Sequence, residues 1–420
     1  MKVLVLGGGG REHALVWRLA QSASVSKIFA APGNPGIARY AELAGAAATP
    51  EACLALAETL DADITVVGPE APLVAGVADM FHRAGRAVVG PTKAAAQLEG
   101  SKIFCKELMA EAGIPTARFV VAGTAAAALA ALPRFEYPVV LKADGLAAGK
   151  GVVVAATRRE AEQAIDGLFS GALAGDAGKQ IVMEDFLPGT EVSFIVLSDG
   201  ETIRALAPAQ DHKAIFDNDR GPNTGGMGAY CDGAILTPHQ TSDIMQRIIQ
   251  PAVQTMARRG TPFSGFLFAG LMMTARGPSL LEFNVRLGDP ECQTLMHRLD
   301  CDLGEVLAAA AHGELHRKQL TWRPEPSVCV VMAAGGYPAA PRTGDVIHGL
   351  EAAEATGVTV FHASTAFGPS GVESAGGRVL GVTARGPSLR DAIRNAYSGV
   401  EQIHFAGMQY RRDIGAKGLS

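Results

Sequence analysis

Four short apolar runs, each followed directly by a glycine- or proline-rich turn, constrain the first hundred residues most strongly. The runs are Val3–Leu6, Ile28–Ala31, Ile64–Val67 and Ala87–Val89, and the turns are GGGGREH, PGNPG, GPEAPL and GPTKAA. Short buried strands separated by helical stretches are typical of a doubly wound parallel sheet, which binds ligands beyond the carboxyl ends of its strands. All four turns fall at that edge, so the pattern predicts one binding crevice in an α/β domain over residues 1–100.

The rest of the chain divides into a long middle segment and a shorter C-terminal one. Strand-like runs follow from Arg118 with one long helical stretch, TRREAEQAIDGLFS, and the composition changes again at residues 321–327, TWRPEPS. These features predict an α+β segment over residues 101–324 and a small α+β domain over residues 325–420. Residues 210–230 show no periodicity, and we expect a long functional loop there.

The composition excludes several classes of protein. The 420 residues carry a net charge of −5 without any run of Lys and Arg, which argues against a nucleic-acid or membrane-surface role. The six cysteines form no C-x-x-C pair, so we expect reduced thiols and neither a disulfide framework nor a zinc site. No signal peptide and no apolar stretch of membrane-spanning length occurs, which predicts a soluble, cytoplasmic protein of several domains.

The opening glycines do not fit a dinucleotide site. The Gly-x-Gly-x-x-Gly/Ala fingerprint fails because its last position holds Glu12 or His13, depending on the register, and the second strand ends without the acidic residue that a ribose requires. This argues against a nicotinamide-dependent oxidoreductase. The turn still places backbone N–H groups at a helix N-terminus beside Arg11, where a single phosphate fits. A tight structural turn with a solvated Arg11 is an equally open interpretation.

A second glycine-rich stretch, KADGLAAGKGVVV at residues 142–154, is not a Walker A loop. Asp144 occupies the first glycine position, Gly151 follows Lys150, and the stretch joins two strands instead of opening a helix. It is therefore typical of a flap whose backbone amides lie over phosphates. Lys142 ends an apolar run, where its ammonium can reach a phosphate oxygen, although a solvated lysine is the simpler interpretation of that residue alone.

The most informative stretch is SLLEFNVRLGDPE. Glu282, Asn284 and Arg286 are spaced to share one face of a strand, while Phe283 and Val285 point to a core. A carboxylate and an amide oxygen side by side are hard ligands that suit Mg²⁺, and an arginine beside them can neutralise a phosphoryl group in transfer. A polar strand face in water fits less well because apolar residues precede the set. A non-catalytic nucleotide sensor would have no need of the arginine, so flap, lysine and metal face together indicate an enzyme that uses ATP.

These stretches occur in an order that matches a known family. The quoted motifs are VLVLGGGGREHAL, APGNPG, VVGPEAPL, LKADGLAAGKGV, QDHK, GPNTGGMGAY and LEFNVRLGDPECQ. From its first strand to near the C-terminus the chain resembles the phosphoribosylamine–glycine ligases, ATP-grasp enzymes of de novo purine synthesis. It departs from them at Leu287, where the family more often has an aromatic residue, and after Lys213, where the residues vary. Neither departure removes a group with obvious chemistry.

The resemblance implies a fold and a reaction. The fold is an N-terminal doubly wound domain, a central ATP-grasp domain with a mobile lid at about residues 116–189, and a small C-terminal α+β domain. The reaction joins glycine to 5-phosphoribosylamine through a glycyl phosphate and gives glycinamide ribonucleotide, ADP and phosphate. The small-molecule partners are glycine and 5-phosphoribosylamine, and we expect a monomer or a weak homodimer. The alternative is another ATP-grasp carboxylate–amine ligase that acts on a phosphorylated sugar or nucleotide.

The resemblance also implies site residues, which fall into four sets. For ATP they are Lys102, Lys142, Gly145, Gly149, Lys150 and Gly151 at the phosphates, Glu184, Phe186 and Leu187 at the adenine edge, and Glu191 at the ribose. For Mg²⁺, or Mn²⁺ in its place, they are Glu282 and Asn284, next to Arg286 at the transferred charge. On the side of glycine and phosphoribosylamine they are Asp211, Lys213, Asn223, Thr224, Gly225, Gly226 and Met227. For the sugar phosphate they are Gly9, Gly10, Arg11, Glu12, Gly33, Asn34, Pro35, Gly36 and Glu70.

Overall fold

The first hundred residues form a parallel sheet, as predicted. The computed structural model describes residues 1–146, 151–173 and 175–419, and its first sheet has the strand order β3-β2-β1-β4-β5. Val3–Leu6 in the central strand are all buried because helices cover both faces of the sheet. The strands are β1 (Lys2–Gly7), β2 (Lys27–Pro32), β3 (Glu42–Leu43), β4 (Ile64–Val67) and β5 (Val88–Val89). The helices are α1 (Gly10–Leu19), α2 (Pro50–Thr59), α3 (Glu70–Ala75), α4 (Val77–Arg83) and α5 (Gln97–Gly100).

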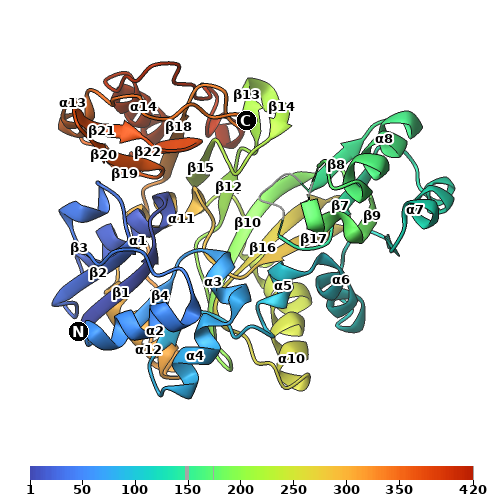
Figure 1. Ribbon diagram of the computed structural model, residues 1–420, viewed down its shortest axis with the longest axis horizontal. Coiled ribbons are helices and arrows are strands. Elements are labelled where there is room, and N and C mark those ends of the chain that lie inside the picture. Colours follow the sequence, from blue (N-terminus) through green and yellow to red (C-terminus); the bar gives the residue numbers. More distant parts are fainter. Residues whose placement is uncertain (147–150, 174, 420) are drawn as a thin grey trace.

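The lid is a separate four-stranded antiparallel sheet that projects from the body of the molecule (Figure 1). Its strand order is β6-β9-β7-β8, and buried residues of its strands and helices form a core of their own. Helix α6, which the Ser101 hydroxyl caps by accepting from Phe104 N at 3.0 Å, leads into it. The elements are α6 (Lys102–Glu111), β6 (Phe119–Ala122), α7 (Ala125–Ala131), β7 (Val139–Ala143), β8 (Val152–Ala155), α8 (Arg158–Phe169) and β9 (Ile181–Asp185).

One large sheet with strands of very different lengths runs through the middle and C-terminal segments. Its order is β17-β16-β10-β12-β15-β18-β22-β19, with β11 paired to β10 at one side. The C-terminal strands join it where β18 pairs antiparallel with β15, so the C-terminal segment has its own helices and core but shares this sheet. The strands are β10 (Thr190–Asp199), β11 (Ile203–Ala205), β12 (Ala209–Asp211), β15 (Gly228–Cys231), β16 (Ser264–Thr274), β17 (Gly277–Asn284), β18 (Ser327–Ala333), β19 (Thr359–His362) and β22 (Arg378–Arg385).

Residues 210–230, which we expected to be a long loop, instead contain short strands. Besides β12 and β15 in the large sheet, they include the hairpin β13 (Ala214–Phe216) and β14 (Arg220–Asn223). The strands are too short to give a readable period. Gly226 turns the chain between β14 and β15 with a φ of +111°, a conformation that favours glycine.

The remaining helices cover the large sheet or fill the space between the segments. None of the helices in the described ranges is long and apolar enough to cross a membrane. Helix α11 follows β17 and lies between α1 and the C-terminal strands (Figure 1). The helices are α9 (Pro238–Ile244), which continues through a π-helical turn (Met245–Ile249) into α10 (Gln250–Arg258), then α11 (Glu291–Arg298), α12 (Leu303–Ala311), α13 (Leu350–Ala355) and α14 (Leu389–Val400). A second hairpin is formed by β20 (Thr365–Gly368) and β21 (Gly371–Ser374).

Candidate active site

A cavity of about 650 Å³ lies where the first domain, the lid and the large sheet meet, and it collects most of the candidate residues. Those that line it are Arg11, Glu70, Lys102, Lys142, Gly145, Gly151, Glu184, Phe186, Leu187, Glu191, Asp211, Lys213, Asn223, Thr224, Gly225, Glu282, Asn284 and Arg286. Those that do not are Gly9, Gly10, Glu12, Gly33, Asn34, Pro35, Gly36, Gly226 and Met227. Gly149 and Lys150 fall outside the described residues.

The start of the flap is hydrogen-bonded to the N-terminal end of helix α6. The Asp144 carboxylate accepts from the Ser101 hydroxyl at 3.0 Å and from Ile103 N at 3.1 Å, and Lys102 Nζ donates to the Gly145 carbonyl at 3.1 Å. Asp144 therefore binds the N-terminus of α6, where negative charge is favoured. This role explains why an aspartate stands where a Walker A loop has glycine.

At the lid end of the cavity, two lysines flank one buried carboxylate. The Nζ atoms of Lys142 and Lys106 lie 3.1 and 3.2 Å from the two carboxylate oxygens of Glu184. Sequence reasoning missed Lys106, because a lysine inside an amphipathic helix carries no motif signal. Glu184 lies in β9, between β6 and β7. Because its carboxylate pairs with both lysines, its side chain, and not only its backbone, contributes to the site.

Of the three residues of the predicted metal face, only Glu282 and Asn284 belong to the strand. Phe283 and Val285 are buried as expected, β17 ends at Asn284, and Arg286 lies beyond it. We therefore correct the expectation of one strand face that includes the arginine. From this position Arg286 Nη2 still donates to Asn284 Oδ1 at 3.2 Å.

Two carboxylates hold Arg286, that of Glu70 at the start of α3 and that of Glu99 in α5. Its guanidinium lies 3.3 Å from the carboxylate of Glu70 and 3.0 Å from that of Glu99. The other Glu99 oxygen accepts from Val285 N at 2.7 Å, so Glu99 fixes both the arginine and the end of the strand. Glu99 is a site residue that sequence reasoning missed.

The donor set at Glu282 and Asn284 fits a hard divalent cation. Burial raises the pKa of Glu282, but Lys213, Lys142, Lys102 and Arg286 outweigh it and lower that pKa, so the carboxylate is ionised. Within the described residues no cluster of three or more His, Cys, Asp or Glu side chains is placed to hold a metal ion by itself. The pair therefore suits an ion that takes its other oxygens from phosphates and water, as Mg²⁺ does.

Near the metal face, positive and negative side chains lie next to one another on the cavity wall. Lys213 Nζ lies 2.8 Å from a Glu191 oxygen, and Glu191, Glu282 and Asp211 raise the pKa of Lys213 in spite of burial. Burial and the neighbouring Glu291 carboxylate raise the pKa of Asp211 well above its usual range. Lys213 is therefore a fixed positive charge, whereas Asp211 is held toward its protonated form.

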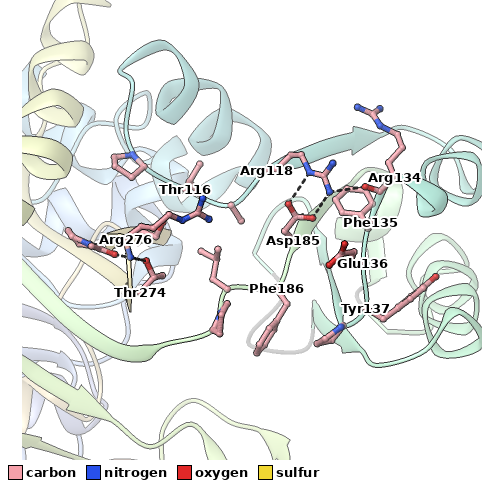
Figure 2. Close-up of a pocket in the computed structure, with 18 of the residues that line it drawn as sticks. Thr116, Arg118, Arg134, Phe135, Glu136, Tyr137, Asp185, Phe186, Thr274 and Arg276 are labelled. Carbon is pink, nitrogen blue, oxygen red and sulfur yellow. Dashed lines mark hydrogen bonds and ion pairs between the residues drawn. The ribbon is translucent and has the colours of Figure 1, made fainter.

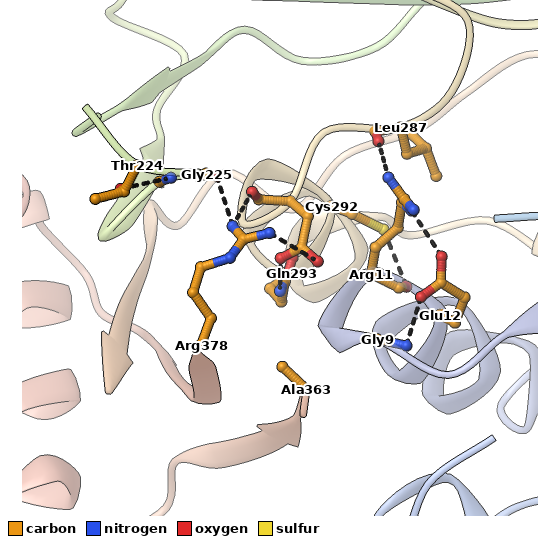
Figure 3. A network of polar contacts seen from close by, with 12 residues as sticks. Gly9, Arg11, Glu12, Thr224, Gly225, Leu287, Cys292, Gln293, Ala363 and Arg378 are labelled. Atoms are coloured by element: carbon orange, nitrogen blue, oxygen red, sulfur yellow. Dashed lines mark hydrogen bonds and ion pairs between the residues drawn. The ribbon is translucent and has the colours of Figure 1, made fainter. Parts of the chain in front are cut away.

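The opening glycine turn is already occupied by an anion of the chain itself. Gly9 N donates to Glu12 Oε2 at 2.7 Å, and Arg11 Nε donates to Glu12 Oε1 at 2.8 Å (Figure 3). Arg11 Nη1 also donates to the Leu287 carbonyl at 3.0 Å, and only 7% of Arg11 is exposed. The expectation that the Gly9 amide is free for a phosphate is therefore wrong, and so is the alternative of a solvated Arg11.

The second predicted phosphate turn, residues 33–36, also has a structural role. Asn34 Nδ2 donates at 2.9 Å to the Gly8 carbonyl and at 2.9 Å to that of His362, so it joins the first domain to the C-terminal segment. A Cβ at Gly36 would stand 2.3 Å from Cε1 of His13. We correct the assignment of Gly33, Asn34, Pro35 and Gly36 accordingly, since this turn is filled by protein atoms.

The C-terminal segment contributes an arginine that no sequence motif marks. Arg378 Nη1 donates to the Gly225 carbonyl at 2.6 Å and also to the Asp289 carbonyl, and its Nη2 lies 3.6 Å from Asp289 Oδ2 (Figure 3). The Tyr337 hydroxyl accepts from Gly225 N at 3.1 Å. Both side chains line the cavity, so the C-terminal segment closes the site at the glycine-rich turn that contains Thr224.

The hinge is the segment at residues 185–189 that connects β9 to β10. A larger cavity, about 960 Å³, lies on its other side and is not the candidate active site. Asp185, Phe186 and Leu187 line both cavities, whereas Lys142 and Glu282 line only the smaller one. Arg118 donates to both carboxylate oxygens of Asp185, at 2.9 and 2.8 Å (Figure 2). This pair fixes the start of the hinge segment from its outer side.

Comparison with known families gives matches along most of the chain. The N, ATP-grasp (A) and C domain models of phosphoribosylglycinamide synthetase match residues 1–99, 100–292 and 327–417. The chain belongs to the phosphoribosylglycinamide synthetase family. The three matches follow the three segments of the fold, so the C-terminal segment that carries Arg378 is part of the family's architecture.

Curated relatives in this family are similar over their full length. The chain is 51% identical over 425 residues to the phosphoribosylamine–glycine ligase of Xanthomonas axonopodis pv. citri, covering 100% of this chain and 98% of that protein. It is 48% identical over 425 residues to the ligase of Yersinia pestis, covering 100% and 99%.

Solved structures show the same arrangement. The phosphoribosylamine–glycine ligase of Thermotoga maritima is 34% identical, with a TM-score of 0.87 over 99% of this chain and 100% of that one. The biotin carboxylase of Campylobacter jejuni shares the fold at 15% identity, with a TM-score of 0.73 over 99% and 94%.

Proposed function

We propose that this chain joins glycine to 5-phosphoribosylamine with ATP, in the manner of the phosphoribosylglycinamide synthetase family. The observation that carries the proposal is the cavity of about 650 Å³ described above. It is lined by Lys102, Lys142, Glu282, Asn284 and Arg286, together with the acidic residues Glu191 and Asp211. A carboxylate is a poor electrophile, so its activation needs a phosphoryl donor, a charge clamp and an aligned amine.

The residues divide the work by their place in the cavity. Lys102 and Lys142, with Gly145 and Gly151 of the flap, hold the ATP phosphates, and the hinge at Phe186–Leu187 meets the adenine edge. The side chains of Glu282 and Asn284 hold Mg²⁺, which when bound neutralises phosphate charge. Glu191 is assigned to the ribose of ATP, an assignment that requires Lys213 to release it or share it.

Acyl transfer is assigned to Arg286 and to the residues around Lys213. Arg286 stabilises the negative charge of the phosphoryl group and then of the glycyl phosphate, because Glu70 and Glu99 hold its guanidinium in place. Lys213, Asn223 and the Thr224–Gly226 turn orient the glycine carboxylate. Asp211, which burial and Glu291 hold toward its protonated form, is assigned to this wall as a hydrogen-bond donor.

The sugar phosphate is assigned to Arg378 rather than to the opening glycines. Gly9 already binds Glu12 and does not line the cavity, whereas Arg378 lines it. An arginine presents several donors in one plane and suits a phosphate dianion.

The test is release of ADP with each small substrate omitted in turn. We expect sustained ADP release only when both glycine and freshly prepared phosphoribosylamine are present, with glycinamide ribonucleotide formed in equal amount. Sustained ADP release without phosphoribosylamine would overturn the proposal. Equal turnover with alanine in place of glycine, or with another phosphorylated amine, would favour a different ATP-grasp carboxylate–amine ligase.

A further inference from the structure

Lys106 is a buried lysine that the proposed mechanism does not use. It is 2% exposed, and its ammonium lies 3.2 Å from Oε1 of Glu184. The other oxygen of the same carboxylate lies 3.1 Å from Lys142 Nζ. Two positive charges therefore share one negative charge at the lid end of the cavity.

The two lysines differ in how they are anchored. Lys106 Nζ donates to Thr116 Oγ1 at 2.6 Å, and Thr116 Oγ1 donates to the Leu280 carbonyl at 2.7 Å, which ties Lys106 to the body of the molecule. Lys142 comes from the lid strand β7 and donates to the Leu281 carbonyl at 3.2 Å. Both ammonium groups thus contact β17, Lys106 through Thr116 and Lys142 directly, but Lys106 lies on α6, whereas Lys142 lies on the lid and is assigned to the nucleotide.

We propose that Lys106 is a positioning residue that keeps Glu184 neutralised, so that Lys142 can leave this carboxylate for the phosphates of ATP. A buried carboxylate with a single cationic neighbour holds that neighbour strongly, because separating them leaves an uncompensated charge out of water. With Lys106 in place, Glu184 keeps one partner after Lys142 has turned away. Without Lys106, nucleotide binding has to break the one ion pair that then remains to Glu184 among the described residues.

This inference rests on the proposed function only in assigning Lys142 to ATP. It concerns nucleotide affinity before any chemistry, so it can be tested without glycine or phosphoribosylamine. Failure of the inference would leave the ligase reaction intact, and absence of ligase turnover would leave the affinity measurement valid.

The experiment measures the Kd for ATP with Mg²⁺ by calorimetry in Lys106→Met, Glu184→Gln and the double variant. We expect Lys106→Met to raise the Kd about tenfold to a hundredfold, because Lys142 then no longer makes its charge-assisted hydrogen bond to the phosphates. Adding Glu184→Gln to it removes the carboxylate that retains Lys142, so the double variant regains most of the affinity. The matched control is Glu107→Gln, an exposed neighbour on α6 that should leave the Kd unchanged.

Recovery in the double variant separates positioning from a merely structural role. If Lys106 only braced the lid, the double variant would bind ATP no better than Lys106→Met, and that result would overturn the proposal. An unchanged Kd in Lys106→Met would overturn it too. If Lys106→Met fails to fold, Lys106→Gln replaces it in both the single and the double variant, and a double variant that binds ATP no better than Lys106→Gln contradicts the proposal.

Discussion

The backbone N–H of Gly9 donates to Oε2 of Glu12 at 2.7 Å, so the N-terminus of helix α1 binds a carboxylate of its own first turn. The second oxygen of Glu12 binds Arg11, which is buried with it. An anion at a helix start satisfies amide donors and interacts favourably with the helix dipole. The glycine run that suggests a phosphate site is therefore a closed structural turn.

Replacing Glu12 with glutamine should destabilise the fold. The amide keeps an acceptor for Gly9 but leaves the buried Arg11 guanidinium without its nearest counter-charge, which should cost about 3 kcal/mol of unfolding free energy. Urea denaturation measures this. The control is Glu51→Gln, which removes an exposed acid from the first turn of α2 and should shift the midpoint far less. Equal shifts in the two variants would show that the Glu12–Arg11 pair stabilises the fold no more than an exposed acid does.

The sequence predicts most reliably what depends on local pattern. The parallel sheet follows from apolar runs such as Val3–Leu6, and Glu282 with Asn284 follows from alternation along a strand, because both depend on neighbouring residues. The family resemblance predicts the reaction, because the motifs of the family occur in order along the chain. These parts of the fold and the family assignment are confirmed.

What the sequence does not reveal are the partners that folding brings from far away. Glu12 meets the Gly9 amide from only three positions away, but the Leu287 carbonyl that accepts from the buried Arg11 lies 276 positions away. Arg378 reaches the Gly225 carbonyl across 153 positions of sequence, and a single arginine in a strand has no motif. Tertiary contacts of this kind decide which candidate groups are still available to a substrate.

Stability should fall as the pH drops, in part because of His297. Burial, then the charges of Arg385 and Arg323, lower the pKa of His297 to about 3, while an unfolded histidine titrates near 6.5. Below about pH 6.5 this histidine is protonated in the unfolded chain but stays neutral in the folded chain. Its contribution to the free energy of unfolding is therefore lost between pH 6.5 and 3. At pH 5 this loss is about 2 kcal/mol.

The check compares urea midpoints at pH 7 and pH 5 in wild type and in His297→Gln. The variant is less stable at pH 7 but should lose less on acidification, since one titrating group is gone. His239→Gln, at an exposed position on α9, should keep the full wild-type pH dependence. A pH dependence of His297→Gln as steep as that of wild type would contradict the assignment.

Glu282→Gln and Asn284→Ala should each raise the Mg²⁺ concentration needed for half-maximal ADP release. Each change removes a hard oxygen or its charge, and weakened metal sites typically lose about tenfold to a hundredfold in affinity. Titration of Mg²⁺ at fixed ATP measures the effect. The matched control is Glu201→Gln, an exposed acid outside the cavity lining, which should titrate as wild type does. Wild-type Mg²⁺ dependence in both site variants would remove the metal assignment.

Arg378→Ala should raise the KM for phosphoribosylamine about tenfold to a hundredfold, the effect of losing one or two charge-assisted bonds to a phosphate. The KM for ATP should change little, because the ATP phosphates are assigned to Lys102 and Lys142 and not to Arg378. Arg378 also binds the Gly225 carbonyl, so its loss can loosen that turn. Tyr337→Phe is the matched control, since it removes a hydrogen bond to Gly225 N from the same segment and leaves the charge in place. If the two variants raise the KM for phosphoribosylamine equally, Arg378 supports the turn and the phosphate lies elsewhere.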